Sequence, residues 1–311
     1  MSFCRRRLIA CTISSVALLL FPAPWDSAAE SSDRSVQNRP VHQGRITQVK
    51  ALRSFKRKPA GQPALPEGIL LKDLTTGQTL FEQHANQPMP PASLTKIMSA
   101  IVLLEEGDLE ASVTVSRHAA AAPRIKLHLK TGQVVPLRGL LEAMLVHSAN
   151  DACLAAVEHV GGDEATFVAK MNIKAEAIGL THTQFQNACG FDMDAHYSTA
   201  EDLATLTEYA MANETFAAIV KEPAAVIRTV NQRKTFVART TNRLLGTMEG
   251  IIGVKTGYTR GAGRCLVTIV RREGKELLLV LLNARQRWST AHALIEYGLR
   301  PQSDFLSTPL R

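Results

Sequence analysis

The sequence predicts a mixed α/β fold of the α+β type: an antiparallel sheet built from both chain ends, flanked by helices and interrupted by an inserted helical lobe. Strand-like apolar runs occur near the start of the folded region and again near its end, and the residues between them show helical periodicity. The expected strands are 68–74, 79–83, 251–254, 265–270 and 277–283. With 311 residues, 45% of them hydrophobic, the chain can bury a core of this size.

The first two strands are expected to form a β-hairpin, because Gly77 lies in the short polar segment between them. A helix is predicted from Ser93 to Glu106, after three prolines and before a glycine. Further helical patterns follow at 137–147, 151–160 and 164–178, the last with Asp163 as its N-terminal cap. These helices form the predicted lobe.

The remaining elements return the chain to the sheet. Ser198 and Glu201 have the spacing of a capping box for a helix that ends near Met211. Residues 272–275 are a turn that joins the last two strands into a hairpin. A final helix is expected from 289 to 297.

The formal net charge of +8 is confined to the first 63 residues, which hold eleven basic and three acidic residues. Arg5–Arg7, the apolar run 8–21 and the small residues 27–29 are typical of a secretory signal peptide over 1–29, with an uncleaved N-terminal anchor as the alternative. Residues 30–63 are predicted to be a basic flexible linker. Because the rest of the chain is neutral, no nucleic-acid partner is expected, only weak contact of the linker with anionic membrane or wall polymer.

Removal of the signal peptide would leave three cysteines, Cys153, Cys189 and Cys265. They allow at most one intramolecular disulfide, and we interpret them as small apolar residues. Neither they nor the histidines have the spacing of a metal site, so no metal and no cofactor are expected.

Ser93 and Lys96 are three positions apart at a predicted helix start, which places a hydroxyl and an amine on one face. Serine needs an adjacent base to act as a nucleophile, and a lysine can supply it if burial or a second cation lowers its pKa. On its own, this motif also fits an ordinary helix start.

Ser148-Ala149-Asn150 lies in the short connection between two predicted helices. A second hydroxyl there could pass a proton to a leaving group, and a carboxamide could bind a peptide backbone. Taken alone, the tripeptide is better explained by helix capping through Ser148 or Asn150.

Lys255-Thr256-Gly257 opens the C-terminal strands and suits an extended peptide that ends in a carboxylate, since glycine permits close backbone approach. The same tripeptide occurs at 130–132, where a turn before a helix is predicted. A single Lys-Thr-Gly is therefore weak evidence.

In this order the three motifs match the set found in penicillin-binding proteins and class A β-lactamases. The segments 91–98, 147–152 and 253–259 resemble the D-alanyl-D-alanine carboxypeptidase family. The same is true of shorter segments around Asn172 and Tyr197 and of the segments 241–245 and 262–266. The resemblance covers about residues 65–300. It implies a DD-peptidase/β-lactamase-like fold, with a catalytic domain over 64–300 and a short tail over 301–311.

The resemblance also implies the roles of the site residues. Ser93 is expected to attack the carbonyl between the two D-alanines of a peptidoglycan stem peptide, and to be acylated by penicillins. Lys96 is expected to take its proton, with Ser148 as the relay to the leaving D-alanine. Substrate binding is expected from Asn150, Lys255, Thr256, Gly257, Tyr258 and Arg287, with the backbone N–H groups of Ser93 and Tyr258 as oxyanion hole and Arg285 as the competitor of Arg287.

One loop departs from the family pattern: residues 187–191 read Asn-Ala-Cys-Gly-Phe where relatives usually have Asn-Pro-His-Gly-Leu. We expect an altered loop near the cleft. The alternatives to a carboxypeptidase are a DD-endopeptidase that cuts cross-links, a β-lactamase and an inactive wall-binding module. The expected location is exported, in the periplasm or facing the cell wall.

Overall fold

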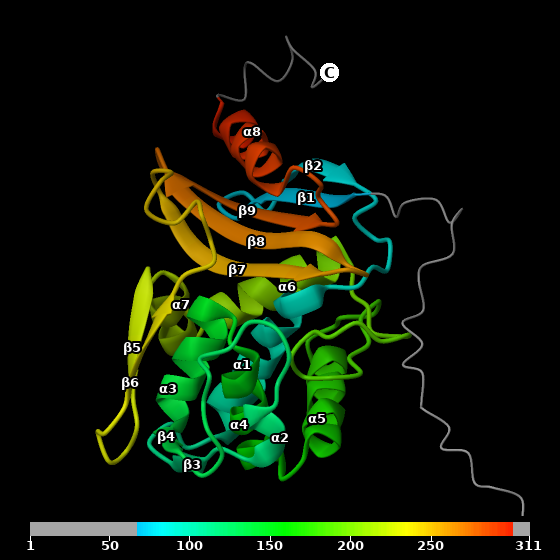
Figure 1. The fold of residues 1–311 in the computed structure, drawn as a ribbon. Coiled ribbons are helices and arrows are strands. Elements are labelled where there is room, and N and C mark those ends of the chain that lie inside the picture. Colours follow the sequence, from blue (N-terminus) through cyan, green and yellow to red (C-terminus); the bar gives the residue numbers. More distant parts are fainter. Residues whose placement is uncertain (1–66, 301–311) are drawn as a thin grey trace, which may run out of the picture. The chain divides into compact units, whose positions relative to one another are not determined.

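The computed structural model describes residues 67–300 (Figure 1). The predicted signal peptide, the basic linker and the tail 301–311 lie outside the described residues. The main sheet has the strand order β2-β1-β9-β8-β7, and every neighbouring pair is antiparallel. Its strands are β1 (Gly68–Asp73), β2 (Thr79–Gln83), β7 (Ile251–Thr259), β8 (Gly263–Arg272) and β9 (Lys275–Leu282). Because β1 pairs with β9, the sheet is built from both ends of the described chain, which confirms the predicted fold class.

Both faces of this sheet are covered by helices. The C-terminal helix α8 (Arg287–Leu299) lies over one face, and the helical lobe lies over the other (Figure 1). Side chains of a strand point alternately to its two faces, so β9 contributes to two separate cores. Leu278, Val280 and Leu282 pack with the lobe, and Leu277, Leu279 and Leu281 pack with α8. Burial on both faces explains why this strand is continuously apolar instead of alternating.

The helical lobe surrounds one central helix, α1 (Lys96–Glu106), whose first eight residues are all buried. A short 3-10 turn, η1 (Ala92–Thr95), precedes it, so the predicted helix at 93–106 starts in two parts. The predicted helix at 137–147 is also divided, into α3 (Leu137–Glu142) and a π-helical turn, η2 (Ala143–His147). The other helices of the lobe are α2 (Arg117–Ala120), α4 (Asn150–Gly161), α5 (Glu164–Ala177), α6 (Ala200–Met211) and α7 (Glu214–Val220).

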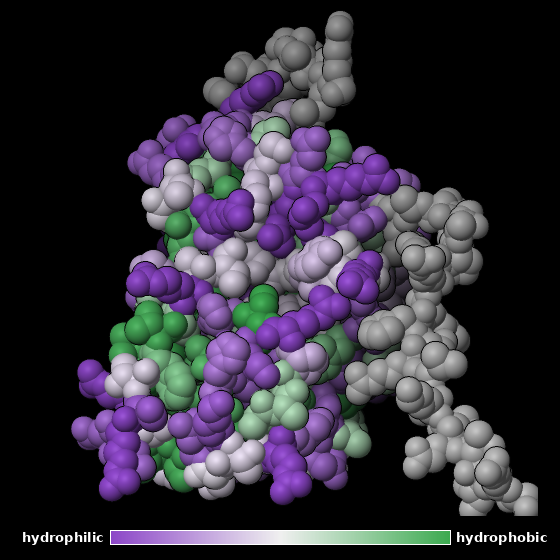
Figure 2. All heavy atoms as spheres, viewed as in Figure 1, coloured by the Kyte–Doolittle hydropathy of each residue, from purple (hydrophilic) through white to green (hydrophobic). Residues whose placement is uncertain are grey.

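Two small two-stranded sheets were not predicted from the sequence; α2 lies between the strands of the first in the chain, and the second is a β-hairpin. One pairs β3 (Ser112–Thr114) with β4 (Val134–Pro136), and the other pairs β5 (Ala224–Arg228) with β6 (Thr235–Arg239). The second hairpin leaves Val226 and Val237 more than half exposed, and Figure 2 shows an apolar patch in this part of the surface. Strands of three to five residues are too short for a period of two to be recognised in the sequence.

The cap of α6 differs from the prediction by one residue. Thr199, not Ser198, is the N-cap, and its Oγ1 accepts a hydrogen bond from the N–H of Asp202 at 3.0 Å. Ser198 instead shares a hydrogen bond of 2.7 Å with the hydroxyl of Thr183. The predicted cap of α5 is confirmed, since the Asp163 carboxylate accepts from the N–H of Thr166.

The interpretation of the cysteines as small apolar residues is wrong for two of them. Cys153 on α4 and Cys189 form a disulfide that joins positions 36 residues apart. Cys265 on β8 is a free, buried thiol, as expected for an apolar residue. Between residues 67 and 300, no helix is both long enough and apolar enough to cross a membrane.

Candidate active site

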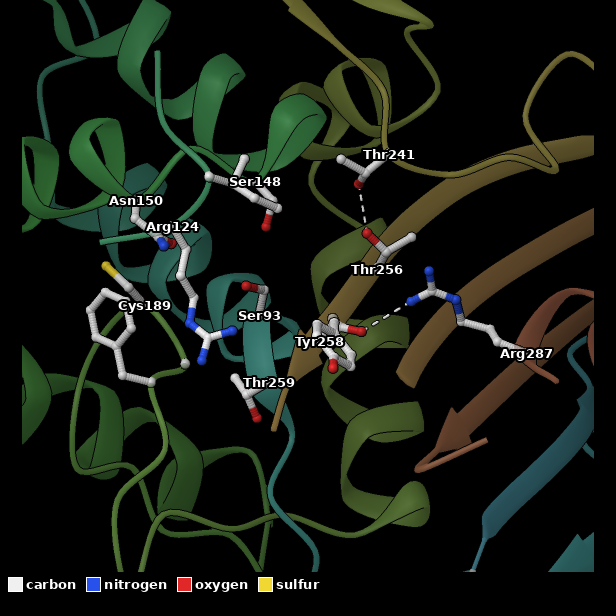
Figure 3. Close-up of a pocket in the computed structure, with 14 residues that line it drawn as sticks. Ser93, Arg124, Ser148, Asn150, Cys189, Thr241, Thr256, Tyr258, Thr259 and Arg287 are labelled. Atoms are coloured by element: carbon white, nitrogen blue, oxygen red, sulfur yellow. Dashed lines mark hydrogen bonds between the residues drawn. The ribbon is translucent and has the colours of Figure 1, made fainter. Parts of the chain in front are cut away.

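A cavity of about 200 Å³ lies where the edge strand β7 faces the helical lobe (Figure 3). Seven of the nine residues predicted to form the site line this cavity, and the other two, Lys96 and Lys255, are buried beneath it. The seven are Ser93, Ser148, Asn150, Thr256, Gly257, Tyr258 and Arg287. The fold therefore brings together residues that are up to 194 positions apart in the chain.

Lys96 is fully buried one turn after Ser93, with its Nζ 3.1 Å from the Ser93 Oγ. The same nitrogen donates to the Asn150 Oδ1 at 2.8 Å and to the backbone carbonyl of Cys189 at 2.6 Å. A neutral amine has two N–H groups and one lone pair. With both N–H groups directed to these two oxygens, the lone pair faces the hydroxyl of Ser93, which is the geometry of a general base.

The charge state of Lys96 agrees with this geometry. Burial lowers its pKa well below the usual value, and the positive charge of Lys255 lowers it further. Burial also lowers the pKa of Lys255, to about 7, with Arg287 acting in the same direction. Burial therefore favours the neutral amine of Lys96, which is the form that can act as a base.

Ser148 lines the cavity and also contacts the buried Lys255. It has a left-handed backbone, with φ of 65°, at the end of η2. Its Oγ accepts a hydrogen bond of 2.8 Å from the Nζ of Lys255, which also donates to the carbonyl of Thr256 at 3.1 Å. Lys255 itself does not line the cavity. It can affect a ligand there in two ways, through its hydrogen bond to Ser148 and through its positive charge.

The loop 187–191 lies beside the cleft, as expected, and holds Lys96 in place. The Asn187 side chain accepts from the N–H groups of Cys189 at 3.2 Å, Gly190 at 2.7 Å and Phe191 at 2.9 Å. Gly190 has φ of 81°, and a Cβ there would lie 2.0 Å from the carbonyl oxygen of Ala92. The disulfide from Cys189 to α4 fixes the carbonyl that binds Lys96 relative to Asn150.

A buried histidine that was not predicted as a site residue supports the turn that carries Ser93. The His196 Nδ1 accepts from the N–H of Gln186 at 2.9 Å, so its Nε2 carries the proton toward the Thr95 Oγ1, 2.8 Å away. Thr95 in turn donates to the carbonyl of Ala92 at 2.8 Å. Burial lowers the pKa of His196 to about 4, although the negative charge of Asp192 acts to raise it. The ring is therefore neutral at pH 7. His196 belongs to the segment around Tyr197 that resembles the family, but no role for it was predicted from the sequence.

Thr256 and Gly257 form the wall of the cavity on β7. The Thr256 hydroxyl shares a hydrogen bond of 2.6 Å with the hydroxyl of Thr241 (Figure 3). Gly257 is packed so closely against η1 that a Cβ would lie 3.1 Å from the backbone nitrogen of Ser93. The strand and the backbone of Ser93 are therefore closely packed, and a side chain at this position would require the neighbouring backbone to shift.

Of the two competing arginines, Arg287 lines the cavity and Arg285 does not. Arg287 donates through one guanidinium nitrogen to the carbonyls of Gly257 at 3.0 Å and Cys265 at 2.8 Å. Burial lowers its pKa to about 10, which leaves it charged at neutral pH. Arg285 is exposed and lines a neighbouring cavity, together with Arg243 and Arg264.

Three further residues line the cavity that the motifs did not indicate: Arg124, Ile125 and Thr259. The Thr259 hydroxyl donates to the carboxylate of Asp192, which also accepts from the N–H of Gly261. Arg124 and Ile125 come from an irregular segment after α2 that contains no recognisable motif. Only the folded chain shows that this segment reaches the cavity.

The comparisons with known proteins agree with this geometry. A family model described as D-alanyl-D-alanine carboxypeptidase matches residues 61–286. The D-alanyl-D-alanine carboxypeptidase DacB2 of Mycobacterium tuberculosis is 34% identical over 260 residues, which cover 79% of this chain and 88% of the relative. DacF of Bacillus subtilis is 33% identical over 70% of this chain, and this match spans 57% of the relative's length.

Two solved structures have the same fold. The Streptomyces K15 DD-transpeptidase superposes with a TM-score of 0.70 at 32% identity, covering 76% of this chain and 98% of the other. Penicillin-binding protein D2 of Listeria monocytogenes, in a cefotaxime-bound form, has a TM-score of 0.66 at 29% identity, covering 77% of this chain and 100% of the other. The motif order, the assembled cavity and these matches together confirm the predicted family: the chain belongs to the D-alanyl-D-alanine carboxypeptidase family.

Proposed function

We propose that the protein is a serine-type D-Ala-D-Ala carboxypeptidase that removes the terminal D-alanine from peptidoglycan stem peptides. The observation that carries this proposal is the buried amine of Lys96, whose Nζ lies 3.1 Å from the Ser93 Oγ and also contacts the Asn150 Oδ1 and the Cys189 carbonyl. The carboxypeptidase names of its curated relatives support the same reaction.

In the acylation step, the Ser93 Oγ attacks the carbonyl between the two D-alanines, and its proton moves to the Nζ of Lys96. The backbone N–H groups of Ser93 and Tyr258 are the proposed oxyanion hole. The position of Gly257, the residue before Tyr258, supports this, because a Cβ on it would lie only 3.1 Å from the Ser93 nitrogen.

Release of the leaving D-alanine requires a proton on its nitrogen. Ser148 is the proposed donor, since its hydroxyl lines the cavity and is replenished from Lys255 at 2.8 Å. The carboxylate of the same D-alanine would bind at Thr256 and Arg287, next to the positive charge on Lys255. Asn150 would use its remaining N–H for the substrate carbonyl, since its other groups are bound to Lys96 and to the Pro123 carbonyl.

The proton that Lys96 took from Ser93 then has to pass to Lys255, which gave one up through Ser148, so that both lysines return to their starting charge states. Neutral Lys96 then acts as the base for the water that hydrolyses the acyl-enzyme, and the proton taken from water returns to the Ser93 oxygen as the ester bond breaks. β-Lactams place a strained amide and a carboxylate in the same positions, so they should acylate Ser93, and the cefotaxime-bound relative supports this. None of the described residues that line the cavity is an Asp or Glu. A class A β-lactamase uses such a carboxylate to activate water against the penicilloyl ester, so we expect slow release of penicillin.

This activity implies an exported enzyme that works in the periplasm or at the cell wall. Peptidoglycan stem peptides are outside the cytoplasm, and the sequence of residues 1–29 has the pattern of a secretory signal. The basic residues of 30–63 would provide at most a weak, salt-sensitive attraction to anionic lipid or wall polymer.

The test uses a fluorescent penicillin, a pentapeptide ending in D-Ala-D-Ala and a cross-linked peptide dimer, with Ser93→Ala as the control. We expect labelling and D-alanine release by the wild-type protein, both abolished by Ser93→Ala. Cleavage of the dimer without D-alanine release would favour an endopeptidase. Absence of Ser93-dependent labelling and hydrolysis would favour an inactive wall-binding module.

A further inference from the structure

Arg124 lines the cavity across Ser93 from Arg287 (Figure 3). Its side chain is exposed, and within residues 67–300 its guanidinium has neither a hydrogen bond nor an ion pair. The carboxylate of Asp192, which follows the lining residue Phe191, is bound by Thr259 and Gly261. Arg124 is therefore a cation that faces the reaction centre and has no partner among the described residues.

The segment that carries Arg124 is fixed to the catalytic machinery on both sides. Asn150 donates from its backbone N–H to the carbonyl of Ile125 and from its Nδ2 to the carbonyl of Pro123, both at 2.8 Å. The carboxylate of Asp151 accepts from the N–H groups of Leu127 at 3.0 Å and Leu129 at 2.9 Å. The backbone of Arg124 is thus held before any ligand binds, which lowers the entropy cost of binding.

The direction of the substrate follows from β7. This strand is at the edge of the sheet, so an extended peptide can add to it as a further antiparallel strand. With the terminal carboxylate at Thr256 and Arg287 and the scissile carbonyl at Ser93, the preceding residues run past Tyr258 toward Thr259. Figure 3 shows the Arg124 guanidinium pointing toward this end of the cavity.

We propose that Arg124 determines specificity by binding a free carboxylate on the side chain of the residue before the D-alanine pair. The proposal rests on the proposed carboxypeptidase function and defines its substrate class more narrowly. A guanidinium binds a carboxylate through two parallel hydrogen bonds, whereas it would repel a side chain that ends in an ammonium group alone. Arg287 and Arg124 would then bind the two carboxylates on either side of the scissile bond.

The experiment compares two isosteric peptides, acetyl-meso-diaminopimelyl-D-Ala-D-Ala with a free side-chain carboxylate and its carboxamide. The measured quantity is the ratio of their kcat/KM values for D-alanine release. For the wild-type protein we expect the carboxylate peptide to be favoured about fivefold, as for one partly solvated charge-assisted contact. The preference should decrease as the ionic strength is raised.

Arg124→Gln should bring this ratio to about one, and Arg124→Glu should invert it. Lys130→Gln is the matched control: it removes one positive charge from the same loop at an exposed residue outside the cavity, and it should keep the wild-type ratio. Labelling by fluorescent penicillin and the melting temperature confirm that each variant is folded.

A ratio of one in the wild-type protein, or an unchanged ratio in Arg124→Gln, would overturn the assignment of Arg124 alone. So would an equal loss in Lys130→Gln, because the preference would then come from the general field of the loop. If the wild-type protein hydrolyses neither peptide, the carboxypeptidase function itself fails, and the inference fails with it.

Discussion

Lys-Thr-Gly occurs at residues 130–132, in a turn before β4, and again at residues 255–257, inside β7. All three residues of the first copy are exposed, and all three of the second are buried. In the first copy the carbonyl of Lys130 accepts from the N–H of Gln133 at 3.0 Å, with Gly132 at φ of 80°, which closes a tight turn. In the second copy Thr256 and Gly257 line the cavity, and Lys255 donates a hydrogen bond to Ser148, which also lines it.

The difference shows that the chemistry belongs to the surroundings and not to the tripeptide. Burial, and secondly the positive charge of Arg287, lower the pKa of Lys255 to about 7, and its Nζ donates a hydrogen bond to Ser148. Thr256 has Thr241 as a hydroxyl partner at 2.6 Å, and Gly257 touches the backbone of Ser93. Substituting the same position in both copies therefore separates the role of the site from the role of the residue type.

The largest difference is expected for the two lysines. Lys255→Ala removes the charge near the substrate carboxylate and leaves the Ser148 hydroxyl without its donor, so kcat/KM for D-alanine release should fall by about 10³-fold. Lys130→Ala should stay within about twofold of the wild-type value, as for most exposed substitutions. Steady-state kinetics on the pentapeptide measure both. Equal losses in the two variants would contradict the assignment of Lys255.

The pH dependence of activity should also come from the buried copy. Lys255 binds a carboxylate only when it is protonated, so kcat/KM should fall as the pH rises through its pKa of about 7 in the free enzyme. One deprotonation gives about tenfold per pH unit, or about 10²-fold from pH 7 to 9. Lys96 acts in the opposite direction: its pKa is lowered by burial, and the neutral form is the active base, so activity falls on the acidic side.

The Lys255→Arg variant tests whether the decline of kcat/KM above pH 7 comes from Lys255 or from another basic group. Arginine stays protonated across this range, so the variant should lose the decline above pH 7, whatever its absolute rate. The kcat/KM profile from pH 5 to 10 is the measurement, with Lys130→Arg as the matched control that keeps the decline. A basic limb that persists in Lys255→Arg would assign the titration to a different group.

The candidate site could be proposed from the sequence because its residues lie in three motifs in a fixed order. Ser93, Lys96 and Ser148 were proposed from these motifs alone, and Lys255 was separated from Lys130 by its position after the second motif. The long elements, such as α1 and β9, were predictable because their apolar patterns are long: the first eight residues of α1 and the last six of β9 are all buried.

The remaining features depend on contacts between distant segments. The disulfide joins Cys153 to a loop 36 residues later, and the sequence gives no pairing rule for three cysteines. Arg124 follows a short helix in an irregular segment, and it reaches the cavity only because Asn150 and Asp151 bind the backbone on either side of it. The role of Thr241 also depends on a distant segment, because its hydroxyl shares a hydrogen bond with Thr256 on β7.

Gly257 and Gly132 are required for different physical reasons, close packing and a positive φ. Substituting each one should therefore affect a different quantity. Gly257→Ala would place a Cβ 3.1 Å from the Ser93 nitrogen and the Pro91 carbonyl, which displaces the nucleophile. We expect kcat/KM to fall roughly 30-fold, since small displacements at the reacting atoms are costly. Gly132→Ala meets no atom within 4 Å, but its φ of 80° disfavours a side chain. It should lower the free energy of unfolding by about 1 kcal/mol and leave the rate unchanged.

The smallest difference is expected for the two threonines. Thr256→Val keeps the shape of the side chain, removes one contact to the substrate carboxylate and leaves the Thr241 hydroxyl without its partner. A hydrogen bond to a charged group contributes about 1.5 kcal/mol or more, so kcat/KM should fall about tenfold, mainly through KM. Thr131→Val changes an exposed residue of the turn and should have no measurable effect on either constant. If Thr256→Val lowers kcat with KM unchanged, the hydroxyl acts only in the transition state, and Arg287 and Lys255 alone would bind the carboxylate in the ground state.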